Sequence, residues 1–251
     1  MRYSLHTALT TVDPKAYGGW EGWLNGPVVD ASSYGGAWTN RGPLSGRALI
    51  NEKATLAGHR EAVLDLAALA HPGDEVLLHH SHHGGRQDHG IFGGYHETFC
   101  LFDGELLDVE FVKLLAHFRP GVAVIVDIDS CHSGGMDRGI LVGRSKARPY
   151  LYSARAPKME RGDAVPIVAD VILRAACRAE ETCIEVPRPE TERVHGAWTW
   201  CLSEALITAA TFGSQFQLAA GIAAREFTNQ HPRLLKLGLN PDRALALPIT
   251  P

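Results

Sequence analysis

Two groups of reactive side chains in this sequence each follow a short apolar segment. Histidines crowd residues 79–83 directly after the largely apolar segment 75–78, and Cys131 comes shortly after the apolar run 122–126. Such runs, apolar without alternation, are typical of parallel strands that are covered on both faces. Ligands bind at the carboxyl ends of strands of this kind. We therefore expect an imidazole and a thiol to meet there, an arrangement suited to nucleophilic catalysis.

Both groups resemble motifs of one peptidase family. Residues 81–85, Ser-His-His-Gly-Gly, resemble the Ser-Gly-His-Gly motif of caspase-like cysteine peptidases in the metacaspase and orthocaspase branch. Residues 129–134, Asp-Ser-Cys-His-Ser-Gly, resemble that branch's Asp-x-Cys-His-Ser-Gly motif, and this second match is highly specific. A histidine about 50 residues before the cysteine also fits the caspase-like order. The resemblance implies that His83 is the catalytic base and Cys131 the nucleophile, although His82 stands where the family usually has glycine.

Weaker matches extend the resemblance over most of the chain. Residues 24–31 are similar to the family's early Gly-Cys-x-Asn-Asp-Ala element, and residues 175–178 and 195–199 are similar to segments of its smaller C-terminal part. The resemblance implies an α/β fold, a caspase-like three-layer α/β/α sandwich with a mainly parallel six-stranded sheet. The length of 251 residues suits a single domain of this kind. We expect it to consist of a large-subunit-like part (1–136), a basic linker (137–165) and a small-subunit-like part (166–251).

Local patterns predict the individual elements. Strands are expected over residues 3–12, 47–50, 75–78, 122–126, 167–176 and 244–249, the last at a sheet edge. Helices are expected over 55–69 with Thr55 as cap, 107–118, 199–210 with Thr199 as cap, and 215–228. Residues 17–46 are expected to form a loop or capping segment with a short helix after Asp30, and residues 86–98 a polar excursion.

The expected chemistry is attack of a Cys131 thiolate on a peptide carbonyl. His83 would withdraw the thiol proton and then donate a proton to the leaving amine. The resemblance implies that backbone N–H groups of Cys131 and Gly84 hold the oxyanion. His132 is expected to point away from the reacting side, because adjacent strand residues project to opposite faces. The alternative for Cys131 is a buried structural cysteine.

Period-two geometry also suggests a specificity pocket. Ser81 lies two residues before His83, and Asp129 lies two residues before Cys131, so each should share a face with its neighbour. A carboxylate beside the nucleophile would select a cationic side chain. The resemblance adds Asp30 and implies an acidic pocket for Arg or Lys. The alternatives are that backbone amides satisfy Asp129 and that Asp30 is a helix N-cap, since Val29 breaks the family motif.

The linker over residues 137–165 carries seven Lys and Arg residues among Gly and Pro. Exposed segments of this kind are where proteolytic nicking concentrates. An enzyme that prefers Arg or Lys would find its own preferred residues tethered nearby at high effective concentration. We therefore expect self-processing at Arg144, Lys146 or Arg148. The alternative is that these charges merely keep a surface loop solvated.

No metal site is assigned from the sequence. His79, His80 and His82 could join His83 as metal ligands, but no recognised zinc signature accompanies them. The resemblance leaves Ca²⁺ open as a cofactor. The comparable positions hold His96, Asp103, Asp108 next to Val109, and Asp137. Calcium prefers six or more oxygens, mostly from carboxylates, and the Asp108-Val109 pair lacks the second carboxylate.

Composition limits the class of protein and its partners. A net charge of −4 without a basic, aromatic-rich segment argues against a nucleic-acid partner. The five cysteines contain no CxxC pair, which favours a reducing compartment over a disulfide framework. Without a signal-like N-terminus or a run of about 18 apolar residues, we expect a cytoplasmic protein with no membrane contact. The sequence does not define the oligomeric state, and a monomer is favoured.

The sequence therefore predicts a cysteine endopeptidase that cleaves protein or peptide substrates after Arg or Lys. One alternative is a catalytically silent caspase-fold adaptor or pseudo-enzyme that binds a partner. Within the enzymes, an arginine-specific peptidase of the separase or gingipain type has weaker motif support. A metal-dependent hydrolase that uses the histidines is the third alternative.

Overall fold

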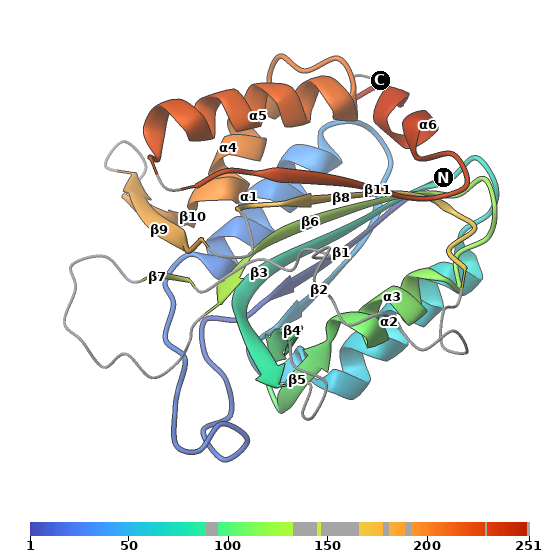
Figure 1. The fold of residues 1–251 in the computed structure, drawn as a ribbon. Coiled ribbons are helices and arrows are strands. Elements are labelled where there is room, and N and C mark those ends of the chain that lie inside the picture. The colour runs from blue at the N-terminus through green and yellow to red at the C-terminus, as the bar shows by residue number, and fades with distance from the viewer. Residues whose placement is uncertain are drawn as a thin grey trace.

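A mixed β-sheet forms the centre of the molecule (Figure 1). The computed structural model describes residues 1–88, 95–132, 145–146, 166–177, 181–188, 192–228 and 230–249. The main path of the sheet runs β11-β8-β6-β3-β1-β2, in which β11 alone is antiparallel to its neighbour. The bounds of these strands are β1 Arg2–Ala8, β2 Ser45–Ile50, β3 Glu75–Asp88, β6 Ala123–His132, β8 Asp170–Ala175 and β11 Arg233–Gly238. This path of six strands confirms the expected mainly parallel order. Two further antiparallel strands, which lie off the path, bring the described sheet to eight strands rather than the expected six.

Helices cover both faces of the sheet, giving the three layers that the resemblance implied (Figure 1). One face carries α2 (Leu56–Leu69) and α3 (Asp108–Leu115). The other carries α1 (Pro27–Thr39), α4 (Ala197–Leu206) and α5 (Phe212–Glu226), with α6 (Pro241–Ala246) packed beside α5. A short 3₁₀ helix, η1 (Asn51–Lys53), follows β2.

The central strand β6 explains why its sequence shows no alternation. Val124, Val126 and Ile128 pack into the core under α2 and α3. Ala123 and Ile125 pack into the core under α1, α4 and α5. Because both faces are buried, every position of the strand favours an apolar residue until Asp127.

The expected polar excursion over residues 86–98 is wrong at its two ends, 86–88 and 95–98; residues 89–94 lie outside the described part of the chain. β3 continues to Asp88, and its last residues pair with the antiparallel strand β4 (Tyr95–Leu101), which pairs in turn with β5 (Gly104–Leu107). Phe99 and Leu101 of β4 are buried in the core beside α2 and α3. Burial of these side chains therefore outweighs the glycines that suggested a loop.

A second, smaller sheet was not expected from the sequence. It contains β10 (Arg193–Gly196), β9 (Cys183–Arg188) and β7 (Ser145–Lys146) in that order. Its strands are short, and the first four residues of β9 alternate between buried and half-buried. Short strands that bury little surface give a weak sequence signal, so their pairing depends on tertiary contacts.

Three local expectations at the element ends are wrong. Residues 244–249 do not form an edge strand; the helix α6 begins at Pro241, a residue favoured in the first turn, and β11 takes the edge position. Thr199 lies inside α4, whose N-cap is Gly196. Asp30 lies inside α1, which begins at Pro27.

The predicted cap of α2 is confirmed. The Thr55 side chain accepts a hydrogen bond from the backbone N–H of Gly58 at 3.0 Å. The helix then ends at Leu69, the end that the sequence predicted.

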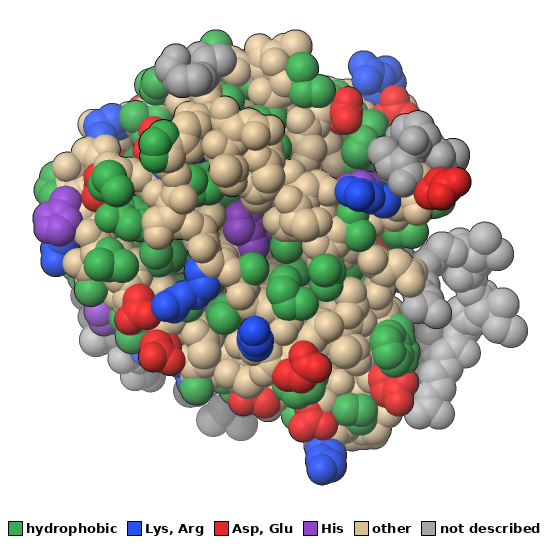
Figure 2. All heavy atoms as spheres, turned by 180° about the vertical axis from the view of Figure 1, so that it is seen from behind, with side chains coloured by type: hydrophobic (Ala, Val, Ile, Leu, Met, Phe, Trp, Pro, Cys, Tyr) green, Lys and Arg blue, Asp and Glu red, His purple; other side chains and the backbone are tan. Residues whose placement is uncertain are grey.

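The surface mixes charges of both signs. On the face in Figure 2, Lys and Arg side chains are interspersed with Asp and Glu side chains, in keeping with the net charge of −4. Within the described ranges, every helix is too short or too polar to cross a bilayer.

Candidate active site

The two motifs lie side by side on the adjacent parallel strands β3 and β6. The register pairs Ser81 with Asp129, His83 with Cys131, and Gly84 with His132. Neighbouring strands lie about 4.8 Å apart, and residues in register project to the same face. The motif residues were expected just beyond the strand ends; instead β3 continues to Asp88 and β6 continues to His132. The backbone thus brings together the two positions expected to carry the base and the nucleophile.

Some expected site residues lie outside the described part of the structure. The side chains of Cys131 and His132 are outside it, so the expected orientation of His132 stays a prediction. Asp137, Arg144 and Arg148 are outside it altogether. Lys146 is described only as a member of β7, where its backbone position pairs with Cys183.

The imidazole of His83 contacts an aromatic side chain from a distant part of the sequence. The His83 side chain is buried, and its ring centroid lies 4.8 Å from that of Trp20 at an interplanar angle of 58°. Trp20 belongs to the segment between β1 and α1, and no sequence motif singled it out. A Trp among closely spaced glycines was the available signal, but it does not reveal which residue the ring contacts.

Asp30 and Ser81, two of the residues expected in the specificity pocket, are hydrogen-bonded to each other. The Ser81 hydroxyl donates to Asp30 Oδ2 at 2.7 Å, and both residues are fully buried. Asp30 also accepts from the backbone N–H of Gly196, at 3.0 and 3.1 Å to its two oxygens, and its Oδ1 lies 3.2 Å from His195 Nδ1. The alternative of Asp30 as the N-cap of its own helix is therefore wrong, because its carboxylate binds the start of α4 instead.

Asp129 also binds the start of α4. Its Oδ2 accepts from the backbone N–H of Thr199 at 2.7 Å, and the residue is fully buried. Asp129 therefore does bind a backbone amide, as the alternative interpretation of this residue predicted. Because α4 has no side-chain cap of its own, carboxylates from α1 and β6 occupy its positive end. Both aspartates consequently lie on the face of the sheet that α1 and α4 cover.

A further carboxylate fixes the entrance to α1. Glu185 of β9 accepts from the backbone N–H groups of Asn25 at 2.9 Å and Gly26 at 2.6 Å. A Cβ on Gly26 would lie 2.9 Å from the backbone nitrogen of Gly196, so only glycine allows this approach. No sequence motif indicated Glu185, because its partners Asn25 and Gly26 lie about 160 residues away in the chain.

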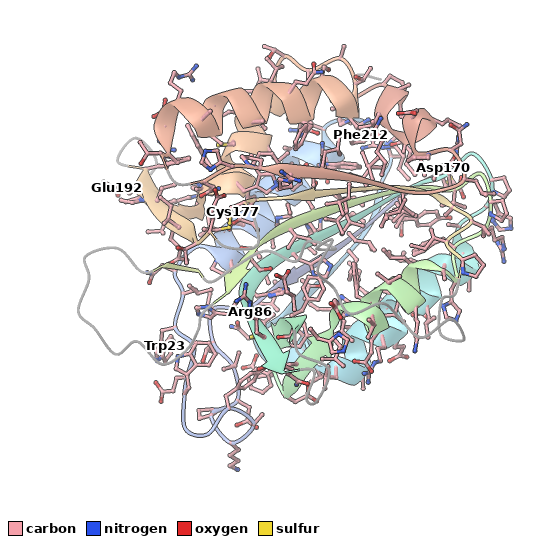
Figure 3. All side chains as sticks on the ribbon, viewed as in Figure 1. Trp23, Arg86, Asp170, Cys177, Glu192 and Phe212 are labelled. Atoms are coloured by element: carbon pink, nitrogen blue, oxygen red, sulfur yellow. The ribbon has the colours of Figure 1, made fainter. Side chains whose placement is uncertain are left out.

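Two buried cysteines, Cys177 and Cys183, lie near the carboxyl end of β6. Cys177 follows β8 (Figure 3), and its Sγ lies 2.8 Å from Sγ of Cys183. Burial, followed by the contact with Cys183, raises the pKa of the Cys177 thiol strongly. Cys183 also contacts the backbone oxygen of Ser130, the residue before Cys131, at 3.7 Å. A pair of buried cysteines thus packs beside the strand that carries the candidate nucleophile.

The described positions considered for calcium make separate contacts. His96 Nδ1 lies 2.8 Å from Asp108 Oδ1, which also accepts from the N–H of Val109. Asp103 accepts from the N–H of Leu56 at the start of α2. In the described part of the chain, no three His, Cys, Asp or Glu side chains gather as a metal ion would require. These residues therefore do not fit a calcium site.

The crowded histidines divide between the two faces of β3. His79 lies 3.1 Å from the hydroxyl of Thr199 and 3.3 Å from His6, on the side of α1 and α4. His80 and His82 lie 3.3 Å apart on the side of α2 and α3. The alternation of the strand separates them, which does not suit a shared metal site.

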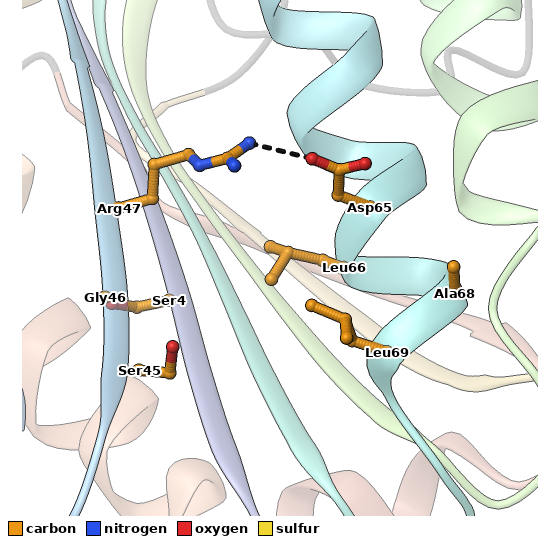
Figure 4. Close-up of a pocket in the computed structure, with 8 residues that line it drawn as sticks. All are labelled: Ser4, Ser45, Gly46, Arg47, Asp65, Leu66, Ala68 and Leu69. Atoms are coloured by element: carbon orange, nitrogen blue, oxygen red, sulfur yellow. Dashed lines mark hydrogen bonds and ion pairs between the residues drawn. The ribbon is translucent and has the colours of Figure 1, made fainter.

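A separate cleft lies between β2 and α2 (Figure 4). It encloses about 360 Å³, and Arg47 and Asp65 form an ion pair of 3.1 Å across it. None of the site residues predicted from the sequence lines it.

Comparisons with known proteins place this geometry in context. The family model described as "Caspase domain" matches residues 11–225. Metacaspase-1 of Arabidopsis thaliana is 29% identical over 156 residues, which cover 57% of this chain and 42% of the relative. Metacaspase-1B of Aspergillus fumigatus is 34% identical over 94 residues, which cover 34% of this chain and 21% of the relative. The chain thus spans less than half the length of the curated relatives it matches.

The fold also matches a solved structure along nearly its whole length. A crystal structure of a Geobacter sulfurreducens protein superimposes with a TM-score of 0.77 and 27% sequence identity. The match covers 97% of this chain and 96% of that protein.

Proposed function

The chain belongs to the caspase domain family, in its metacaspase branch, and we propose that it is a cysteine endopeptidase that cleaves after Arg or Lys. The observation that carries this proposal is the register that pairs His83 with Cys131 on adjacent parallel strands. A base and a nucleophile must lie within hydrogen-bond reach for proton transfer, and this register allows it.

In the proposed mechanism, His83 takes the proton of the Cys131 thiol, and the sulfur attacks the carbonyl carbon of the scissile bond. The carbonyl oxygen becomes an oxyanion that accepts from the backbone N–H groups of Cys131 and Gly84. Collapse of this intermediate breaks the C–N bond, and His83 returns the proton to the leaving amine. His83 then takes a proton from water, which attacks the carbonyl carbon of the acyl-enzyme. The C–S bond breaks, and His83 returns the proton to the sulfur of Cys131.

The proposed preference for Arg or Lys rests on the two buried aspartates beside the dyad strands. Asp30 and Asp129 lie on one face of the sheet, and Ser81 holds Asp30 by a hydrogen bond of 2.7 Å. A carboxylate that is already desolvated pairs strongly with a cation and rejects an anion. In the proposed complex, the guanidinium or ammonium group of the substrate would donate to these carboxylates.

Self-processing in the segment 137–165 follows from this preference as a further part of the proposal. Arg144, Lys146 and Arg148 remain the proposed cut positions. Lys146 would first have to leave its pairing with Cys183 in β7, since a protease binds an unpaired, extended chain. The proposed enzyme is cytoplasmic and monomeric. The reduced thiols of Cys100, Cys177 and Cys201 are in keeping with a reducing compartment.

The dyad is tested with a peptide library containing Arg, Lys or Asp before the scissile bond, with and without calcium. Cys131→Ala and His83→Ala should abolish cleavage and leave the circular dichroism spectrum unchanged, because each removes one partner of the proton transfer. Mapping new N-termini of the wild type against Cys131→Ala tests self-processing. A folded wild type that cleaves none of the peptides would favour the adaptor alternative instead.

The pocket charge is tested at Asp129. Asp129→Ala should cost about 2 to 5 kcal/mol of transition-state stabilisation towards Arg substrates. Asp129→Asn is the sharper variant, because its amide oxygen can still accept from Thr199 while the charge is gone. We expect kcat/KM for Arg peptides to fall in both variants, and the stability to fall only in Asp129→Ala. Equal cleavage after Arg and Asp by the wild type would contradict the acidic pocket.

A further inference from the structure

The segment between β1 and α1, residues 9–26, is closed on itself by backbone hydrogen bonds. The N–H of Val12 donates to Glu21 at 3.0 Å, and the N–H of Leu24 donates to Thr10 at 2.9 Å. The segment projects from the end of the sheet where the carboxyl ends of β3 and β6 lie (Figure 1). We call it the tryptophan loop, because it carries Trp20 and Trp23.

The tryptophan loop is also anchored to the β4–β5 hairpin. The N–H of Asp13 donates to the backbone oxygen of Phe102 at 2.8 Å, and the Tyr17 hydroxyl donates to that of Leu101 at 2.6 Å. The Tyr17 ring meets the Trp20 ring edge-on, with centroids 5.8 Å apart. Both rings pack against the core cluster under α2 and α3. The loop therefore holds the indole of Trp20 against a fixed surface.

Glycines allow the chain to turn tightly around Trp20. Gly18, Gly19 and Gly22 have φ values of 62°, 93° and 60°, which other residues rarely adopt. A Cβ on Gly22 would also lie 3.2 Å from the Trp20 ring. The sequence thus keeps glycine on both sides of Trp20, which permits the seating of its indole.

The indole so held lies against the candidate catalytic base. The ring centroids of Trp20 and His83 are 4.8 Å apart, and His83 is buried. An imidazole packed against an indole can adopt fewer ring orientations than one beside water. Fixing the base in a productive orientation lowers the entropic cost of reaching the transition state.

We propose that Trp20 is a positioning residue, which holds the imidazole of His83 in the orientation that takes the proton from Cys131. This inference rests on the proposed function, because it assigns His83 the role of base. Trp20 itself would touch neither the substrate nor the reacting atoms.

The test compares Trp20→Phe with Trp20→Leu. Leucine keeps apolar bulk against the core but removes the planar face, whereas phenylalanine keeps both. Trp20→Leu should lower kcat on the order of tenfold to a hundredfold and change KM by less than about twofold. Trp20→Phe should restore kcat to within about threefold of the wild type.

Trp23→Leu is the matched control. Trp23 lies on the same loop (Figure 3), its side chain is 57% exposed, and its indole N–H donates to Glu21. Because Trp23 does not contact His83 in the described part of the structure, we expect the Trp23→Leu variant to have the same kcat as the wild type. A kcat loss shared by Trp20→Leu and Trp23→Leu would assign the effect to the loop as a whole and overturn the proposal.

A second readout needs no substrate. The rate at which iodoacetamide alkylates Cys131, followed by mass spectrometry of its peptide, reports how well the base activates the thiol. Trp20→Leu should slow this alkylation, and Trp20→Phe and Trp23→Leu should not. If Cys131 of the wild type is alkylated rapidly but the protein cleaves no peptide, the proposed peptidase activity is refuted. The positioning role of Trp20 would not be affected by that result. Unchanged alkylation and kcat in Trp20→Leu, or a raised KM with unchanged kcat, would overturn the positioning role.

Discussion

Two regions on opposite faces of the sheet bury polar side chains in different ways. In the arginine cluster, under α1 and α5, Arg174 donates to both oxygens of Asp127 at 2.7 and 2.8 Å and to Gln215 at 2.8 Å. In the histidine cluster, under α2 and α3, the rings of His59 and His80 lie 5.2 Å apart. Among the described residues, neither nitrogen of His59 has a hydrogen-bond partner.

The electrostatic consequence is opposite in the two clusters. Burial alone would lower the pKa of Arg174, but Asp127 raises it above its usual value, so the charge persists. Burial lowers the pKa of His59 to about 3 and that of His80 well below its usual range, so both stay neutral. The arginine cluster keeps its charge by pairing, whereas the histidine cluster excludes charge. Stability should therefore respond to lost partners in the first and to protons in the second.

The largest effect is expected from Arg174→Met. The variant leaves Asp127 as a fully buried charge without its cation, and losing one partner of a buried pair costs about 3–5 kcal/mol. Urea unfolding of the variant measures the loss. Adding Asp127→Asn should recover part of it, because the uncompensated charge is then gone. A single-variant loss below about 1 kcal/mol would show that the pairing is dispensable and break the comparison.

Acid should destabilise the protein through the histidine cluster. Above pH 6.5 His59 is neutral in both states; below it the unfolded chain binds a proton that the folded protein does not, down to the folded pKa of about 3. Stability should therefore fall as the pH decreases, by up to about 1.4 kcal/mol per unit for this residue. His59→Leu should flatten the slope between pH 6 and pH 4. The exposed His117 is the control, and an equal flattening by His117→Gln would contradict this origin.

The smallest effect is expected from an exposed pair of the same residue types. Arg47 and Asp65 lie 3.1 Å apart, with about half of each side chain exposed. Solvent screens such pairs, so Arg47→Ala should cost less than about 1 kcal/mol. The ratio of this loss to that of Arg174→Met in the same unfolding assay isolates what burial adds to an arginine–aspartate pair. Similar losses would mean that burial does not explain the difference.

The sequence predicted those strands, helices and motif residues that a pattern of neighbouring residues defines. Thr55 marked the start of α2, and the apolar run before Asp127 marked β6. The motif resemblance placed His83 and Cys131 on neighbouring strands, as their register now has it. The roles of both residues remain proposals.

The sequence could not predict features that depend on distant partners. β11 and β9 are short and partly exposed, so their patterns resemble loops. Residues 244–249 are apolar, and a short apolar run does not distinguish a strand from a buried helix end. Asp30 binds an N–H group 166 residues away, which no local pattern can reveal.

The pairing of β8 with β6 has a consequence for any cleaved form of the protein. β6 precedes the segment 133–169 and β8 follows it, yet the two are hydrogen-bonded neighbours inside one sheet. Arg174 of β8 is bonded to Asp127 of β6 and to Tyr34 of α1, so the buried network also joins the two halves. A nick between these strands would leave two polypeptides interleaved as a non-covalent heterodimer. Size-exclusion chromatography would then report one particle where a denaturing gel reports two chains.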